Sequence, residues 1–217
     1  MPYGAVIFDL DGTLLDTLED LADATNSVLT RLGFPTHPVS AYRRFVGNGA
    51  FELVRRVLPA ESRDDKTLEK CHRAFLQTYA RNRHSKTHPY PGIAALLDRL
   101  ANEKIKSAVL SNKPHTMAVE IVKTLLAPWR FETVLGQRNG YSPKPDPAGA
   151  FEIAQQMKMS VSEFIFVGDS GVDMKTAAAA GMFPVGAAWG FRSEEELRQS
   201  GARTIITDPL KICTMFG

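Results

Sequence analysis

The chain has 217 residues, of which 44% are hydrophobic and 23% charged, as is typical of a globular protein with one good-sized core and a smaller second unit. Its formal net charge of +2 does not favour nucleic acid as a partner, and no apolar run approaches membrane-spanning length. Cys71 and Cys213 have no C-x-x-C partner, and the N-terminus lacks the pattern of a signal peptide, so we expect a protein of the cytoplasm.

The first predicted element is a buried strand at AVIF (5–8), which runs into the segment DLDGT (9–13). Asp-Gly after an apolar run is also typical of a β-hairpin turn. The leucines that follow recur at helical spacing, however, and predict a helix over 16–32, so the hairpin is disfavoured. Asp16 and Glu19 are expected to form a capping box at the start of this helix.

The pattern of residues 16–88 predicts helices only, whereas the chain beyond the breaker HPYPG (88–92) alternates between helices and strands. Such alternation predicts an α/β fold with a doubly wound parallel sheet. The helical block is then an insertion, which gives a core domain of residues 1–15 and 89–217 and a helical cap domain of residues 16–88. The expected helices cover 16–32, 39–46, 50–58, 65–83, 92–103, 115–126, 147–157, 173–181 and 193–201, and the expected strands cover 5–8, 105–111, 131–136, 163–169, 183–189 and 203–207.

Chemically active residue types stand where several of these strands end. In open parallel sheets, ligands bind at the carboxyl ends of the strands. We therefore expect four acids, a lysine, a hydroxyl and a side-chain amide to gather at one edge of the sheet. The segments concerned are Asp9-Leu10-Asp11-Gly12-Thr13, Ser111-Asn112-Lys113, Lys144-Pro145 and Gly168-Asp169-Ser170-Gly171-Val172-Asp173.

The charges of this cluster restrict what it can bind. Asp9, Asp11 and Asp169 would repel one another unless a cation lay among them. Carboxylate oxygens without histidine or cysteine suit Mg²⁺, and Lys144 adds a second positive charge. Together these groups indicate a phosphoryl-transfer site. The groups expected to donate hydrogen bonds to the phosphate are the side chains of Ser111 and Asn112 and the backbone N–H groups near Gly12 and Thr13.

The two acids of the first motif have separate expected roles. Side-chain alternation along a strand would place Asp9 and Asp11 on the same side. Asp9 can then attack phosphorus and form an aspartyl phosphate. Asp11 can protonate the leaving oxygen and later deprotonate the attacking water.

With these four segments in this order, the sequence resembles the haloacid dehalogenase superfamily of phosphatases. The resemblance spans most of the chain and implies Asp9 as the nucleophile and Asp11 as the acid and base. It also implies Mg²⁺ on Asp9, the backbone carbonyl of Asp11 and Asp169, with Asp173 aiding directly or through water. The helical insertion resembles the cap that closes over the active site in this family.

Within the superfamily, FVGNGAFELVRR (45–56) and SNKP (111–114) resemble the phosphoglycolate phosphatase group. Gly47 and Asn48 fall where related caps place a loop that faces the active site, although a plain helix–helix turn would also explain the glycines. Lys113 could bind a substrate carboxylate or face solvent. The cap arginines, expected on its surface unless one binds that carboxylate, are Arg43, Arg44, Arg55 and Arg56.

These expectations define a Mg²⁺-dependent phosphatase that hydrolyses a small organic phosphomonoester, with 2-phosphoglycolate favoured, through an aspartyl-phosphate intermediate. The expected partner is this small phosphate ester, without nucleic acid or membrane, and the expected state is a monomer or homodimer. A sugar phosphomutase or a pyrophosphatase of the same superfamily is an alternative. A signalling receiver domain is disfavoured, because Asp11 and the helical insertion would have no role in it.

Overall fold

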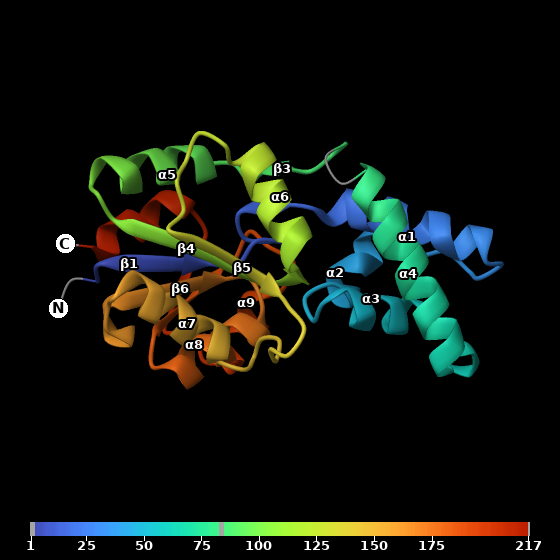
Figure 1. Ribbon diagram of the computed structural model, residues 1–217. Coiled ribbons are helices and arrows are strands. Elements are labelled where there is room, and N and C mark those ends of the chain that lie inside the picture. The colour runs from blue at the N-terminus through green and yellow to red at the C-terminus, as the bar shows by residue number, and fades with distance from the viewer. Residues whose placement is uncertain (1–2, 83–84, 217) are drawn as a thin grey trace.

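The computed structural model describes residues 3–82 and 85–216, and its core is a six-stranded parallel sheet with helices on both faces (Figure 1). The strand order is β5-β4-β1-β6-β7-β8, and each neighbouring pair is parallel. The predicted doubly wound α/β fold is thereby confirmed. The strands are β1 (Ala5–Phe8), β4 (Lys106–Pro114), β5 (Thr133–Gln137), β6 (Phe164–Gly168), β7 (Phe183–Ala187) and β8 (Thr204–Ile206).

The central strand β1 is buried on both faces of the sheet. Val6 and Phe8 pack into a hydrophobic cluster with side chains of α5 and α6, whereas Ala5 and Ile7 pack into a second cluster with α7 and α8. This alternation explains why the strand reads as an unbroken apolar run. The helices of the core are α5 (Ile93–Asn102), α6 (His115–Leu125), α7 (Ala148–Met157), α8 (Gly171–Ala180) and α9 (Glu194–Gln199).

The helices between β1 and α5 lie together at one end of the molecule (Figure 1), and we refer to them as the cap. Their apolar faces build a hydrophobic cluster of their own, which includes Leu21, Leu53 and Phe75. Phe191 from the loop after β7 joins this cluster, so the core also contributes to it. Residue 83, at the end of the last predicted cap helix, lies outside the described residues. The cap helices are α1 (Leu18–Arg31), α2 (Tyr42–Phe45), α3 (Ala50–Val57) and α4 (Asp65–Asn82).

The two chain segments that connect core and cap are paired with each other. β2 (Leu15–Asp16) and β3 (His88–Pro89) form a small antiparallel sheet that the helix-only prediction for this region missed. The carboxylate of Asp20, which is 3% exposed, accepts hydrogen bonds from the backbone N–H groups of Lys86 and Thr87 and from the Thr87 hydroxyl. The start of the cap is therefore tied to its end.

The predicted capping box at the start of the first cap helix is wrong. Asp16 belongs to β2, and α1 begins at Leu18 with Thr17 as its N-cap residue. The Asp16 carboxylate accepts a hydrogen bond from the backbone N–H of Leu18, whereas Glu19 forms an exposed ion pair with Lys86. Strand pairing with β3 shifts the helix start away from the sequence signal.

Two boundaries near the strand ends also differ from prediction. β4 continues to Pro114, because after a register shift beyond Leu110 Pro114 pairs with Gln137 of β5, so Ser111-Asn112-Lys113 is part of the strand. α8 begins at Gly171, because Ser170 and Asp173 form a capping box at its start. Asp173 thus lies in the first turn of a helix.

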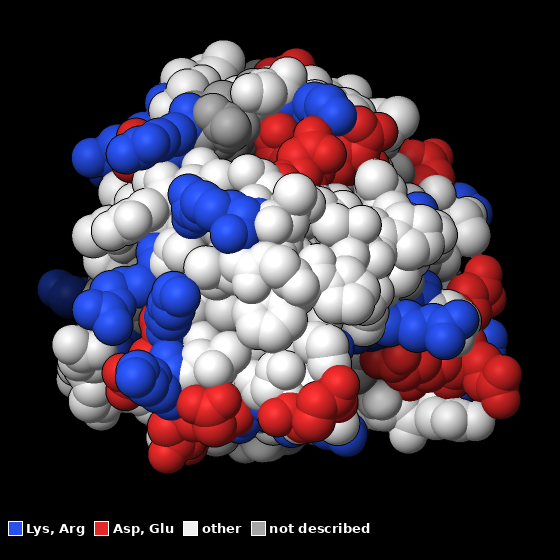
Figure 2. Space-filling view, turned by 90° about the vertical axis from the view of Figure 1, so that its right-hand side faces the viewer, with Lys and Arg blue, Asp and Glu red and all other residues white. Residues whose placement is uncertain are grey.

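The face of the cap end carries both signs of charge. Groups of basic and acidic side chains lie at its edge around a largely uncharged centre (Figure 2). Within the part of the chain that the structure describes, no helix is both long and apolar enough to cross a bilayer.

Candidate active site

A tight turn at the end of β1 presents the two acids of the first motif. The backbone N–H of Asp9 still donates to Val167 of β6, at 2.9 Å, but the Leu10 carbonyl then accepts from Leu14 and Leu15. The strand alternation used to place Asp9 and Asp11 together is therefore wrong, because β1 has ended before them. Both carboxylates nevertheless line one cavity.

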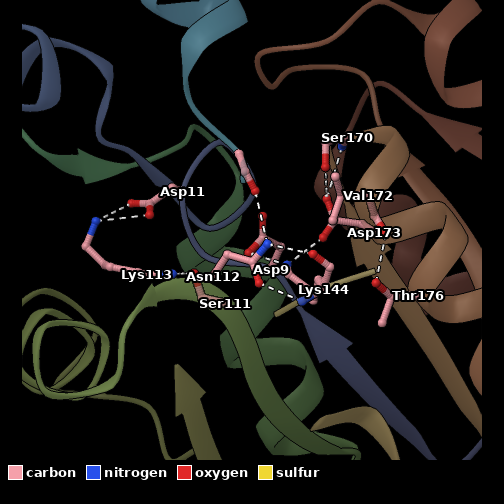
Figure 3. A network of polar contacts seen from close by, with 11 residues as sticks. Asp9, Asp11, Ser111, Asn112, Lys113, Lys144, Ser170, Val172, Asp173 and Thr176 are labelled. Atoms are coloured by element: carbon pink, nitrogen blue, oxygen red, sulfur yellow. Dashed lines mark hydrogen bonds and ion pairs between the residues drawn. The ribbon is translucent and has the colours of Figure 1, made fainter. Parts of the chain in front are cut away.

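Lys144 lies between two of the predicted acids. Its Nζ is 2.8 Å from Asp9 Oδ1 and 2.6 Å from Asp173 Oδ1, and the side chain is 3% exposed (Figure 3). Burial alone would lower the pKa of Lys144, but Asp173 and Asp9 raise it above its ordinary value. The lysine therefore stays charged and offsets part of the negative charge of the site.

Three carboxylates form a group that could hold a metal ion. Asp9, Asp169 and Asp173 each offer an oxygen within 4.8 Å of the others. Burial, followed by the charge of Asp173, raises the pKa of Asp9 to about 7, and burial with both neighbouring acids raises the pKa of Asp169. The single positive charge of Lys144 does not offset the negative charge of three buried carboxylates. The site therefore fits a divalent cation with oxygen ligands.

Close backbone approach fixes the position of Asp169. Its Oδ2 accepts a hydrogen bond of 2.6 Å from the backbone N–H of Phe191. A Cβ atom on Gly12 would lie 2.3 Å from that same oxygen, and Gly12 has a φ of +91°. Glycine is therefore required here both for the turn and for the space that Asp169 occupies.

Asp11 is paired with Lys113 on the other side of Asp9 (Figure 3). Lys113 Nζ lies 2.8 and 3.0 Å from the two Asp11 oxygens and 3.0 Å from the hydroxyl of Tyr79 on α4. Lys113 is 6% exposed, so the prediction that it could face solvent is wrong. Burial would lower the pKa of Lys113, but Asp11 and Tyr79 raise it.

The predicted phosphate donors have different surroundings. The Asn112 amide is used by backbone groups: Nδ2 donates to the carbonyls of Lys144 and Gly47, and Oδ1 accepts from the Lys144 N–H. Its contact with phosphate stays a prediction that would need one of these bonds to break. Ser111 lines the cavity. The backbone N–H groups of Gly12 and Thr13, also predicted as phosphate donors, donate instead to the carbonyls of Leu15 and Leu10.

The cap loop faces the cavity through its glycines, but not through Asn48. Gly47 and Gly49 line the cavity, but Asn48 Oδ1 accepts a hydrogen bond of 2.7 Å from Arg56 Nη2. The substrate-facing position predicted for Asn48 is therefore wrong in this structure. Arg56 also donates to the carbonyls of Arg44 and Phe45, so it ties the loop to the end of α2.

The cavity lies where the cap meets the core, with a volume of about 50 Å³. Its cap side is mainly apolar, and its core side presents the two acids of the first motif together with residues of β4. The lining residues are Asp9, Asp11, Leu21, Val46, Gly47, Gly49, Ala50, Leu53, Phe75, Leu76, Tyr79, Ser111, Asn112, Lys113, Pro114 and Met117.

Two arginines whose roles the sequence did not indicate connect cap and core in opposite directions. Arg43 of the cap donates to the Gly190 carbonyl at 2.8 Å, and Arg192 of the core donates to the Val46 carbonyl at 2.6 Å. Long-range backbone contacts of this kind leave no motif in the sequence. They hold the cap against the loop that also binds Asp169.

Comparisons with known proteins agree with this fold. A family model for the haloacid dehalogenase-like hydrolases matches residues 6–187, so the chain belongs to this family. A phosphoglycolate phosphatase of Pseudomonas savastanoi pv. phaseolicola is 33% identical, over 95% of this chain and 77% of that protein.

Solved structures extend the similarity to the whole chain. A candidate phosphoglycolate phosphatase from Lactobacillus delbrueckii subsp. bulgaricus superposes with a TM-score of 0.94 at 30% identity and covers 100% of both chains. A predicted phosphoglycolate phosphatase from Haemophilus somnus superposes with a TM-score of 0.91 at 27% identity, over 99% of this chain and 98% of that one. The expected resemblance and the expected class, a phosphoric monoester hydrolase, are thereby confirmed.

Asn48→Ala tests whether the cap loop contributes to recognition through its position. Loss of the bond to Arg56 should loosen the loop and lower kcat/KM for a small aliphatic phosphate by about threefold to tenfold, the value of one hydrogen bond. An activated aryl phosphate should be affected less. Arg55→Ala is the matched control, because Arg55 is exposed and its ion pair is with Glu52 on its own helix. Equal losses on both substrates would contradict a role in recognition.

Proposed function

We propose that the protein is a Mg²⁺-dependent phosphatase for a small organic phosphomonoester, with 2-phosphoglycolate as its favoured substrate. The observation that carries the proposal is the buried group of Asp9, Asp169, Asp173 and Lys144 at the edge of a cavity that Asp11 also lines. The phosphoglycolate phosphatases among the similar proteins support the choice of substrate.

Asp9, Asp169 and Asp173 would hold the metal ion, and the backbone carbonyl of Asp11 would complete the protein ligands. Mg²⁺ would supply positive charge to the phosphate oxygens while charge builds up during transfer. Lys144 is placed to add to that charge from the protein side. The repulsion among the buried carboxylates is the reason why such an ion is expected here.

The reaction that we propose has two halves. A carboxylate oxygen of Asp9 attacks phosphorus, the bond from phosphorus to the ester oxygen breaks, and Asp11 gives that oxygen a proton. Asp11 then accepts a proton from a water molecule whose oxygen attacks the aspartyl phosphate. Inorganic phosphate leaves, and Asp9 is restored. The cap keeps other water from the site while the intermediate exists.

Phosphate release from a panel of phosphomonoesters, with pyrophosphate included, tests the proposed activity. A phosphatase releases inorganic phosphate from 2-phosphoglycolate, whereas a sugar phosphomutase would isomerise a sugar phosphate without release. We also propose that the protein acts in the cytoplasm, in line with its two unpaired cysteines, as a monomer or homodimer. Neither nucleic acid nor a membrane is proposed as a partner.

Activity is expected to disappear in EDTA, to return with Mg²⁺ and to be inhibited by Ca²⁺. Calcium takes a larger and looser ligand shell, which would misplace an in-line attack. Mg²⁺ should also raise the Tm, because a bound cation stabilises the folded state that presents three buried carboxylates. The Asp169→Asn variant should lose most of this rise. Full turnover by the EDTA-treated wild type would contradict metal dependence.

A further inference from the structure

Tyr79 is a cap residue whose hydroxyl reaches the core side of the cavity. It lies on α4, is 1% exposed, and lines the cavity between cap and core. Its hydroxyl oxygen is 3.0 Å from Lys113 Nζ, which also lies 4.7 Å from the centre of the Tyr79 ring. Neither the DxDGT motif nor the other matching segments contain this residue.

The hydrogen bonds around Lys113 leave one donor unused. The Lys113 ammonium directs its protons to the two Asp11 oxygens and to the Tyr79 oxygen, which acts as an acceptor. The hydroxyl proton of Tyr79 has no acceptor among the described residues. Burial raises the pKa of Tyr79, so the hydroxyl keeps its proton and remains a donor. A buried donor without a partner is costly unless a ligand or water accepts from it.

The rest of the cavity wall narrows the choice of ligand. On the cap side it is formed by apolar side chains such as Leu21, Leu53 and Phe75. Among the described lining residues, Lys113 is the one with a positive charge. The cap arginines named as alternatives do not line the cavity, and Arg43 and Arg56 are held by carbonyl or amide oxygens. Asp9 and Asp11 line the same cavity, so an acceptor group with negative charge has its favourable contacts at Lys113 and Tyr79.

We propose that Tyr79 and Lys113 together bind a carboxylate of the substrate. The Tyr79 hydroxyl is the donor that the cap contributes, and Lys113 turns one of its two protons on Asp11 toward the substrate. The substrate class is then the phosphomonoester of a short hydroxy acid, whose phosphate lies at Asp9 and whose carboxylate lies at this pair. Because Tyr79 belongs to the cap and Lys113 to β4, the carboxylate bridges the two parts. This inference rests on the proposed phosphatase activity. It adds the residues by which the protein would distinguish a phosphate ester with a carboxylate from one without it.

A matched pair of substrates tests the assignment. 2-Phosphoglycolate and ethyl phosphate differ in whether a carboxylate or a methyl group ends the molecule. Tyr79→Phe should lower the ratio of their kcat/KM values by about tenfold or more, the loss expected for a hydrogen bond to a charged group. The change should appear mainly in KM for 2-phosphoglycolate. For ethyl phosphate, kcat/KM should stay within about twofold, because this substrate has no carboxylate for Tyr79 to bind.

Tyr42→Phe is the control for loss of a buried hydroxyl in the cap. Tyr42 is fully buried and donates to Asn26 Oδ1 at 2.7 Å, away from the cavity. This variant should leave the substrate ratio unchanged. If Tyr79→Phe also leaves it unchanged, or if the wild type does not prefer 2-phosphoglycolate to ethyl phosphate, the carboxylate assignment is wrong while the phosphatase proposal stands.

A binding measurement separates this inference from the proposed activity. 3-Phosphonopropionate and propylphosphonate differ in the same carboxylate and cannot be hydrolysed at the bridging position. By calorimetry, the wild type should bind the carboxylate-bearing phosphonate about tenfold more tightly or better, and Tyr79→Phe should lose most of that advantage. If no phosphomonoester is hydrolysed, the activity proposal fails, and this difference in affinity still decides the role of Tyr79. Equal affinities in the wild type would overturn it.

Discussion

Asp9→Asn is expected to remove phosphoenzyme formation with every substrate and to lower turnover by a factor on the order of 10⁴ to 10⁶, the range for catalytic groups that act as a unit in a hydrolase. The amide cannot attack phosphorus as the carboxylate does. The substitution should also affect stability, because it removes one of the buried acids that repel one another. The variant should therefore fold at least as stably as the wild type in the absence of metal.

Asp11→Asn should have the opposite effect on the phosphoenzyme. An activated aryl phosphate needs no proton on its leaving group, so Asp9 can still be phosphorylated. Hydrolysis of the aspartyl phosphate then lacks its base, and the intermediate should accumulate. Intact-protein mass spectrometry after incubation with an aryl phosphate measures the adduct on each variant.

Asp146→Asn is the matched control for these two variants. Asp146 is exposed, and its Oδ1 accepts from the backbone N–H of Ala148, a bond that asparagine can also make. This variant should behave as the wild type. An adduct on Asp9→Asn, or its persistent absence on a folded Asp11→Asn, would show that the two roles are assigned wrongly.

The sequence predicted the sheet well, because its signals are local. Short apolar runs such as AVIF mark strands buried on both faces, and the helices between them carry one apolar side. The topology of a doubly wound sheet then brings its strand ends to one edge. For this reason Asp9, Asp169 and Lys144 could be placed together before any contact was known.

The partners of individual side chains could not be predicted in the same way. Asp11 and Lys113 are 102 residues apart, and Arg43 and Gly190 are 147 apart. No periodicity carries such contacts. Asn48 was expected to face the substrate because of its place in a glycine loop. Its amide instead accepts a hydrogen bond from Arg56 in the helix that follows, α3.

The connections between core and cap were missed for a different reason. β2 and β3 each have two residues, too few for an alternating pattern. They pair with each other across the whole length of the cap, and Asp20 also binds the returning chain at Thr87. The capping signal of Asp16 and Glu19 was locally reasonable, but this non-local pairing overrides it.

Lys144→Met is expected to lower kcat by about 100-fold to 1,000-fold, the loss typical for a preorganised group that stabilises charge in a transition state. Lys144 is placed for this role by its contacts with Asp9 and Asp173. The same substitution leaves the buried carboxylates of Asp9 and Asp173 without their cationic partner, which should lower the free energy of unfolding by about 3–5 kcal/mol without metal. Kinetics with saturating Mg²⁺ and chemical denaturation measure the two effects separately.

A second substitution separates catalysis from stability. In Lys144→Met with Asp173→Asn, one negative charge is removed along with the positive one, and the amide oxygen can still accept from Ser170 at the start of α8. Part of the stability should therefore return, but kcat should not. Lys175→Met, an exposed charge change on the same helix, should affect neither. Because Asp173 is also a proposed metal ligand, the double variant is compared with Asp173→Asn alone. If the double variant turned over as fast as Asp173→Asn, Lys144 would serve the fold and not the transfer of phosphate; if its kcat were lower by a further factor of about 100 in a stable protein, the charge of Lys144 would be needed by the reacting phosphate itself.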